Sequence, residues 1–116
     1  MSEAPKPPTL ALTLDWQEGL RFHGQCGTAT IVLDSSHERQ AGPSPVQALA
    51  FSLAGCMGMD VVDILLKGRH PLRGLQARLE AERSPEHPRR LVAAHLHFLV
   101  TGAVPAGAVE RALQLS

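Results

Sequence analysis

The stretch that decides the fold is the most hydrophobic segment of the chain, Pro45-Val-Gln-Ala-Leu-Ala-Phe-Ser-Leu-Ala-Gly-Cys-Met-Gly-Met-Asp-Val-Val-Asp-Ile-Leu-Leu66. Its apolar residues recur at helical spacing. Ser44 is a suitable N-cap, with Pro45 at the first helical position. Gly68 supplies a break and Pro71 prevents continuation. We therefore predict one long helix over this stretch.

Both sides of this predicted helix are apolar. One face carries Val46, Ala50, Leu53, Met57, Val61 and Ile64, and the opposite side carries Ala48, Gly55, Met59, Val62 and Leu66. A helix that is hydrophobic all round is buried all round. A sheet covers only one side, so the pattern predicts that a second copy of the chain covers the other side in a homodimer.

The same stretch is long enough to span a bilayer. Asp60 and Asp63 would each cost about 2.5–3.5 kcal/mol at the centre of an inserted helix. We therefore expect a buried helix of a soluble protein, with no membrane partner.

Five strand patterns flank the helix, three before it and two after it. Alternating or β-branched apolar residues mark residues 10–16, 20–24, 28–33, 75–81 and 92–100. On the last of these, Val92, Ala94, Leu96, Phe98 and Val100 are expected to form the buried face. A second helix is expected to begin near Pro105, with Val109, Ala112 and Leu113 facing inward. The fold class is therefore α+β, with the first three antiparallel strands in a meander and all five in one sheet. Residues 1–9 are expected to be a flexible lead-in, and residues 10–116 a single domain.

Composition excludes several classes of partner. Eleven Lys and Arg residues balance eleven Asp and Glu residues, and aromatic residues are few. No net field or stacking surface therefore favours nucleic acid. The N-terminal residues have no basic segment followed by an apolar run, and two cysteines do not make a disulfide framework. These features predict a cytoplasmic protein.

Cys56 is the main candidate for chemistry. A free cysteine within a core helix is often a small buried hydrophobe, and the alternative is a reactive thiol. Asp60, one turn later, disfavours the thiolate. A reactive Cys56 therefore needs a cation, and Arg39 in the preceding loop is the nearest candidate in the sequence. The alternative for Arg39 is a solvated loop residue.

The remaining candidates are weaker. Cys26 follows a strand, and its separation from Cys56 excludes a CxxC motif. His95 and His97 share one strand face without an evident third ligand, so we expect a solvent-facing or interface surface there and no metal. A glycine-rich phosphate loop is absent, and no cofactor is expected.

Four segments together resemble the OsmC/Ohr family, and most closely its YhfA-like branch. They are Gly42-Pro-Ser-Pro-Val-Gln-Ala-Leu49, Ala54-Gly-Cys56, Asp60-Val-Val-Asp-Ile-Leu-Leu-Lys-Gly-Arg69 and His95-Leu-His-Phe-Leu-Val-Thr-Gly102. The resemblance runs from about residue 10 to the end. It implies an intertwined homodimer whose long central helices are buried between two sheets.

The resemblance also implies chemistry at Cys56. Active members reduce organic or hydrogen peroxides through a peroxidatic cysteine at this position, assisted by an arginine that Arg39 matches loosely. A second cysteine captures the sulfenic acid, and a dithiol reductant regenerates the pair. The family places that second cysteine beyond Ser116, which implies that the C-terminal part of the domain is missing from this sequence, and Cys26 is not its equivalent. The family's orienting carboxylate position is held here by Val46, with Gln47 next.

Two functional interpretations follow. The first is an OsmC-like thiol protein that reduces hydroperoxides at Cys56 in oxidative stress defence. The second is a non-enzymatic homodimer that binds a small apolar molecule in its interface cleft, with Cys56 as part of the lining.

Overall fold

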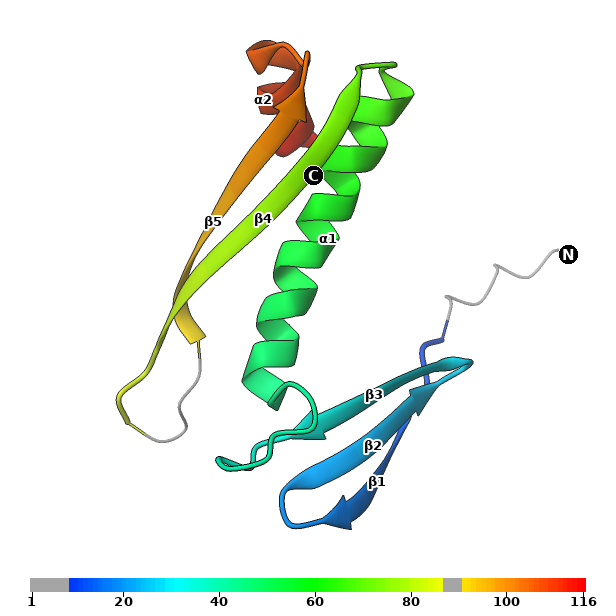
Figure 1. Ribbon diagram of the computed structural model, residues 1–116, viewed down its shortest axis with the longest axis vertical. Coiled ribbons are helices and arrows are strands. Elements are labelled where there is room, and N and C mark those ends of the chain that lie inside the picture. Colours follow the sequence, from blue (N-terminus) through cyan, green and yellow to red (C-terminus); the bar gives the residue numbers. More distant parts are fainter. Residues whose placement is uncertain (1–8, 87–90) are drawn as a thin grey trace, which may run out of the picture. The chain divides into compact units, whose positions relative to one another are not determined.

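The computed structural model describes residues 9–86 and 91–116, with the element order β1-β2-β3-α1-β4-β5-α2 (Figure 1). The chain divides into two compact units, residues 1–45 and residues 46–116. The predicted lead-in falls almost entirely outside the described residues. That residues 10–116 act as one domain stays a prediction.

The N-terminal unit contains the predicted meander. Strands β1 (Thr13–Glu18), β2 (Arg21–Cys26) and β3 (Ala29–Asp34) pair antiparallel in that order. Gly19 and Gly27 form the two turns with φ of 51° and 60°, a backbone conformation that glycine adopts at little cost. The first strand begins at Thr13 rather than at Leu10, so the apolar alternation extends beyond the paired backbone.

The two faces of this meander differ in chemistry. Cross-strand register places an apolar set on one face, namely Leu14, Trp16, Phe22, Ile31 and Leu33. All except Leu33 are exposed within the chain. The other face carries Asp15, His23 and Val32, together with the pair Arg21 and Asp34. Among residues 9–45, which the structure describes, nothing therefore covers the apolar face.

The central helix α1 (Pro45–Lys67) begins where the sequence predicts. Its end differs from the prediction in one respect. Arg69, not Gly68, adopts the left-handed conformation, with φ of 58°. The N–H of His70 donates to the carbonyl of Leu65, and the N–H of Arg69 donates to that of Leu66. This pattern is a Schellman ending, which requires the left-handed residue one position after Gly68.

The C-terminal unit packs α1 against a two-stranded sheet and a short helix. Strands β4 (Leu72–Arg83) and β5 (Leu91–Gly102) pair antiparallel, and α2 (Ala106–Leu115) follows (Figure 1). The fully buried side chains at the centre of this core are Val61, Leu65 and Ala112. Val109 and Leu113 are half-buried, as predicted for the inner side of α2.

Two expectations about the sheets were wrong. The described strands form a three-stranded and a two-stranded sheet, not one sheet of five. Strands pair here only with sequence neighbours, since short connections cost the least loop entropy. Leu96, Phe98 and Val100 face inward on β5 as predicted, whereas Val92 and Ala94 are exposed. These two residues lie at the end of β5 far from the core cluster, where little covers them.

By length and composition, α1 could cross a membrane, with a mean hydropathy of 1.8. The same measures fit the core helix of a soluble protein, so they do not distinguish the two. Asp60 and Asp63 both lie on exposed positions of this helix.

Candidate active site

Cys56 lies in the middle of α1 and is a free, exposed thiol within the single chain. The buried face of the helix is marked by Gly58, Val61 and Leu65. Two residues of helix turn the chain by about 200°, so Cys56 points away from the side that Gly58 packs on the sheet. The chain's own β4–β5 sheet covers one side of the helix as predicted, and cover of the other side by a second copy stays a prediction.

The neighbours of Cys56 on this face are Ser52 and Asp60, one turn before and one turn after it. The hydroxyl of Ser52 donates to the carbonyl of Ala48 at 2.8 Å, so it is engaged within the helix. Asp60 is exposed, and its carboxylate lies one turn from the thiol. Farther along, Asp63 and Lys67 form an exposed ion pair at 2.9 Å. The helix itself therefore offers Cys56 no activating cation in the adjacent turns.

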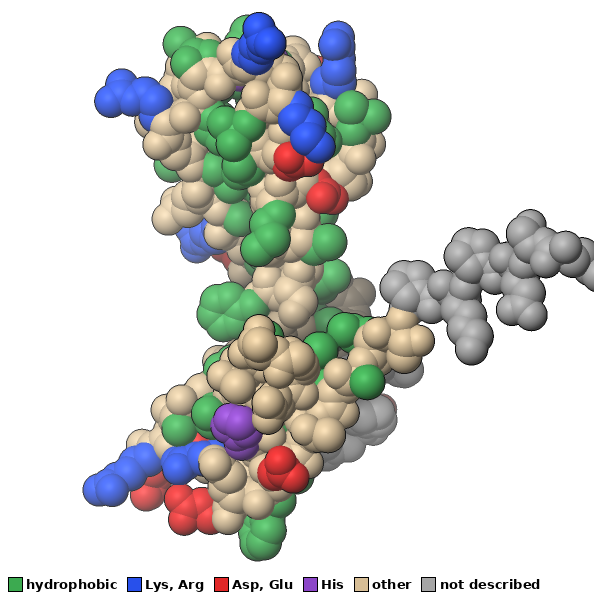
Figure 2. All heavy atoms as spheres, turned by 90° about the vertical axis from the view of Figure 1, so that its right-hand side faces the viewer, with side chains coloured by type: hydrophobic (Ala, Val, Ile, Leu, Met, Phe, Trp, Pro, Cys, Tyr) green, Lys and Arg blue, Asp and Glu red, His purple; other side chains and the backbone are tan. Residues whose placement is uncertain are grey.

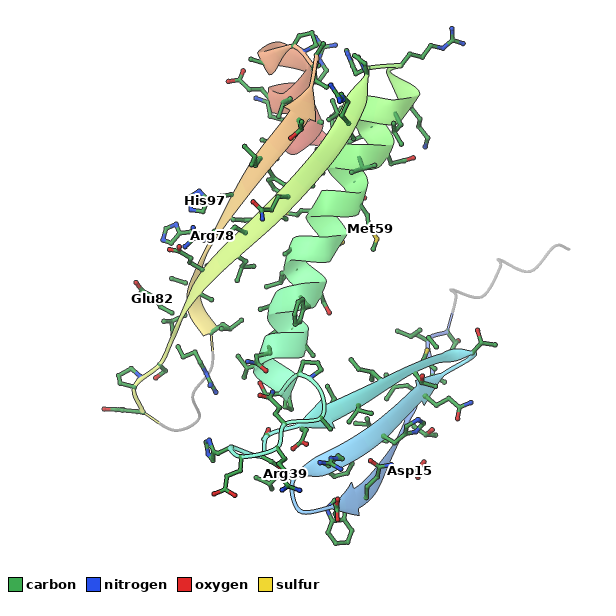
Figure 3. All side chains as sticks on the ribbon, viewed as in Figure 1. Asp15, Arg39, Met59, Arg78, Glu82 and His97 are labelled. Carbon is green, nitrogen blue, oxygen red and sulfur yellow. The ribbon has the colours of Figure 1, made fainter. Side chains whose placement is uncertain are left out.

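Arg39 lies on the loop between β3 and α1 (Figure 3). Its side chain is exposed, and within the described residues its guanidinium has no ion-pair partner. Its backbone is held, because Nη2 of Arg21 donates to the carbonyl of Arg39 at 3.3 Å. Arg39 belongs to the N-terminal unit and Cys56 to the C-terminal unit, and the surroundings of each residue are those of its own unit.

The loop that carries Arg39 is organised around Asp34, a carboxylate with 0% exposure. The N–H of Ser36 donates to Oδ1 at 2.8 Å, and the N–H of Ala41 donates to Oδ2 at 3.0 Å. Nε of Arg21 reaches the same Oδ2 at 3.0 Å. The Ser36 hydroxyl, these N–H groups and Arg21 hold the pKa of Asp34 well below its usual range, although desolvation acts in the opposite direction.

Sequence reasoning missed Asp34 and Arg21. An Asp at the end of a strand followed by two serines is typical of an Asx turn, and this signal was available. The pairing of Asp34 with Arg21 could not be predicted from local sequence, because the two residues lie 13 positions apart and meet only through the register of β2 and β3.

The other predicted candidates are Cys26, His95 and His97. Cys26 is a half-buried free thiol on β2. His95 and His97 are exposed on β5, paired across the strands with Glu80 and Arg78. In Figure 3, Arg78, Glu82 and His97 point from the sheet to the side away from α1. Across residues 9–86 and 91–116, no group of three potential ligands is arranged to hold a metal ion.

An open groove of about 730 Å³ lies between α1 and β4. Its lining is almost entirely apolar, with Asp63 and Arg73 as the charged exceptions; the apolar contributors with large side chains are Phe51, Met59, Val62, Leu66, Leu72 and Leu75. Met59 extends outward from α1 (Figure 3) and is 75% exposed. Hydrophobic side chains are also exposed on the side of the molecule that Figure 2 shows.

An α+β chain with a long central helix and a mid-helix thiol defines a class of protein, and comparison with known families identifies it. Residues 36–116 match the family model described as OsmC-like protein. The chain therefore belongs to the OsmC-like family.

Within that family, the chain is similar to Protein YhfA of Escherichia coli strain K12, with 37% identity over 102 residues. The match covers 87% of this chain and 76% of YhfA, which places the chain in the YhfA-like branch.

Solved structures agree with this fold. An OsmC-like protein from Mycoplasma pneumoniae superposes with a TM-score of 0.81 at 16% identity, covering 95% of this chain and 81% of that one. An organic hydroperoxide resistance protein from Elizabethkingia anophelis superposes with a TM-score of 0.66 at 11% identity, covering 97% and 86%.

Proposed function

We propose that this protein is a cytoplasmic, thiol-dependent hydroperoxide reductase with Cys56 as its peroxidatic residue. The observation that carries the proposal is the exposed thiol at the middle of α1, outside the chain's own core. Membership of the OsmC-like family supports it, as does the shared fold with a protein named for organic hydroperoxide resistance.

The reaction needs one thiolate and no cofactor. The sulfur of Cys56 attacks one oxygen of the hydroperoxide, and the O–O bond breaks. The leaving oxygen takes a proton and departs as an alcohol, while the sulfur, oxidised by two electrons, becomes a sulfenic acid. An external dithiol then attacks the sulfenic acid, releases water and is itself oxidised to a disulfide, which restores the thiol.

Arg39 is the cation that we assign to the thiolate. A reactive thiolate needs a positive group near it, and the turns of α1 next to Cys56 carry none. The guanidinium of Arg39, which has no ion-pair partner in the part of the chain that the structure describes, lies on a loop with a fixed backbone and is suited to this role. Val46 provides no carboxylate to orient it, in contrast to the family pattern.

Hydroperoxide consumption tests this proposal. With cumene hydroperoxide and dithiothreitol, we expect turnover by the unmodified chain and by Cys26→Ser, and no turnover by Cys56→Ser. Equal turnover by Cys56→Ser would contradict the assignment, because Cys56 supplies the only sulfur that the proposed step uses.

The same proposal includes a homodimer. Two apolar surfaces have no cover from the described residues of their own units. They are the meander face and the outer side of α1, where the exposed residues are Leu49, Phe51, Leu53, Met59 and Leu66. Contiguous exposed apolar surface of this kind is typical of an interface. A second copy would cover both surfaces and would surround Cys56 with the apolar walls that exclude water from a reacting peroxide.

The groove between α1 and β4 favours a second candidate function, the binding of a small apolar molecule. Its volume and apolar lining suit a ligand of modest size. A fluorescent apolar probe would bind to Cys56→Ser as tightly as to the unmodified chain under this alternative. Failure of the probe to bind either protein would exclude it.

A further inference from the structure

The loop between β3 and α1 is held by the side chains of Asp34 and Arg21, together with the end of strand β3. Asp34 binds the N–H groups of Ser36 and Ala41 through its carboxylate, and its own N–H donates to the carbonyl of Pro43 at 3.0 Å. Arg21 binds the carbonyl of Arg39 between them. The loop is therefore fixed near its start, at its middle and at its end.

The guanidinium of Arg21 links the carboxylate of Asp34 to the backbone of Arg39. Its Nε donates to Asp34, its Nη2 to the carbonyl of Arg39, and its Nη1 to Glu18 at 3.2 Å. The planar guanidinium fixes the directions of these bonds relative to one another. A shift of Arg21 would therefore move the backbone of Arg39 as well.

Gly42 adds a steric reason for the loop to keep one path. A Cβ at this position would collide with the carbonyl oxygen of Val32 on β3. The loop thus lies directly against the strand, where only glycine fits. This close approach brings Ala41 to the distance at which its N–H reaches Asp34.

We propose that Asp34 and Arg21 are positioning residues that hold the 35–44 loop in one conformation and thereby set the place of the Arg39 guanidinium in the reaction at Cys56. This inference rests on the proposed function, because it assigns the pair a role through Arg39. A misplacement of about 1 Å in a catalytic group can cost up to about 100-fold in rate. In this proposal Asp34 and Arg21 act only through the loop.

The first test does not depend on activity. Trypsin cleaves after Arg39 only when the loop opens, so Arg21→Gln should raise cleavage there by about 10-fold or more relative to cleavage after Arg69. Arg21→Lys keeps the positive charge but loses the planar guanidinium with its several donors, so it should give an intermediate rate of cleavage after Arg39. Glu18→Gln is the matched control, since it removes only the exposed bond of the same guanidinium and should leave cleavage unchanged. Equal cleavage after Arg39 in Arg21→Gln and the unmodified chain would overturn the proposal.

The second test measures the oxidation rate of the Cys56 thiol by cumene hydroperoxide. We expect Arg21→Gln to be about 10-fold slower or more, and the double variant Arg21→Gln/Arg39→Gln to be no slower than Arg39→Gln alone. If the two substitutions instead slow oxidation by factors that multiply in the double variant, Arg21 does not act through Arg39. An inert thiol in the unmodified chain would overturn the proposed function and the catalytic role of the pair, and the trypsin result would still decide whether the pair holds the loop.

Discussion

At the residue scale, the two side chains that matter most are Cys56, on α1, and Asp34, at the end of β3. The thiol of Cys56 is exposed at the middle of its helix, and the carboxylate of Asp60 lies one turn away. Asp34 shows the opposite arrangement, a buried carboxylate whose charge is satisfied by N–H and O–H donors. A small number of polar groups therefore fixes the shape of the loop before α1.

The low pKa of Asp34 predicts a specific dependence of stability on pH. Because the pKa in the folded chain lies below the unfolded value of about 3.9, the ionised carboxylate stabilises the fold above about pH 4. This stabilisation is lost as the pH falls further toward the folded pKa. Urea unfolding at a series of pH values should show Asp34→Asn less stable than the unmodified chain at pH 7, with the difference shrinking below about pH 4. A difference that is constant down to pH 2 would contradict the assignment.

The left-handed conformation of Arg69 predicts a stabilising substitution. A non-glycine residue in this conformation costs about 1 kcal/mol, so Arg69→Gly should raise the free energy of unfolding by about that amount. Arg69→Ala is the matched control, since it removes the same side chain and keeps the strain. Urea denaturation checks both variants, and a less stable Arg69→Gly would show that the side chain outweighs the backbone term.

At the element scale, much of the fold was predictable from the sequence. Helix α1 begins at Pro45, and the meander and the inner faces of β5 and α2 follow from apolar spacing. The division into two sheets and the exposure of Val92 could not be predicted from the sequence. Apolar periodicity indicates which residues share a face of a strand, but it does not indicate what covers that face. The Asp34 and Arg21 pair depends on strand register, which local patterns do not specify.

The core between α1 and the C-terminal elements predicts a large effect for one deletion. Leu65 is 1% exposed and sits beside Val61 and Ala112. Leu65→Ala should lower the free energy of unfolding by about 3 kcal/mol, through lost burial and the cavity left behind. Leu115→Ala, at a position 68% exposed, should change it by less than about 0.5 kcal/mol. Similar losses for the two variants in urea denaturation would contradict this core.

At the scale of the whole molecule, the described residues bury few hydrophobic side chains completely and leave many large ones exposed. The fully buried hydrophobic residues are Val61, Leu65 and Ala112, whereas large apolar side chains on β1, β2, β3 and α1 are exposed. An intertwined homodimer, which the family resemblance implies, would cover these surfaces. Such a dimer would also place Cys56 in a site built from two chains.

Sedimentation equilibrium tests the dimer. We expect a mass of twice the 12.4 kDa chain. Met59→Glu places a charge on the outer side of α1, at a position that the single chain leaves exposed, and should shift the equilibrium toward the monomer by 10-fold or more, a cost of about 1.4 kcal/mol. Glu82→Gln, on the outer side of the β4–β5 sheet, is the control. A monomeric mass for the unmodified chain would contradict the predicted assembly.

Trapping of the sulfenic acid tests the central claim most directly. The protein is treated with cumene hydroperoxide in the presence of dimedone, digested, and analysed by mass spectrometry for the adduct. The account predicts a dimedone adduct on Cys56 in the unmodified chain and in Cys26→Ser, at a level that rises with the peroxide dose. A Cys56 that remains an unmodified thiol while peroxide is in excess would contradict it.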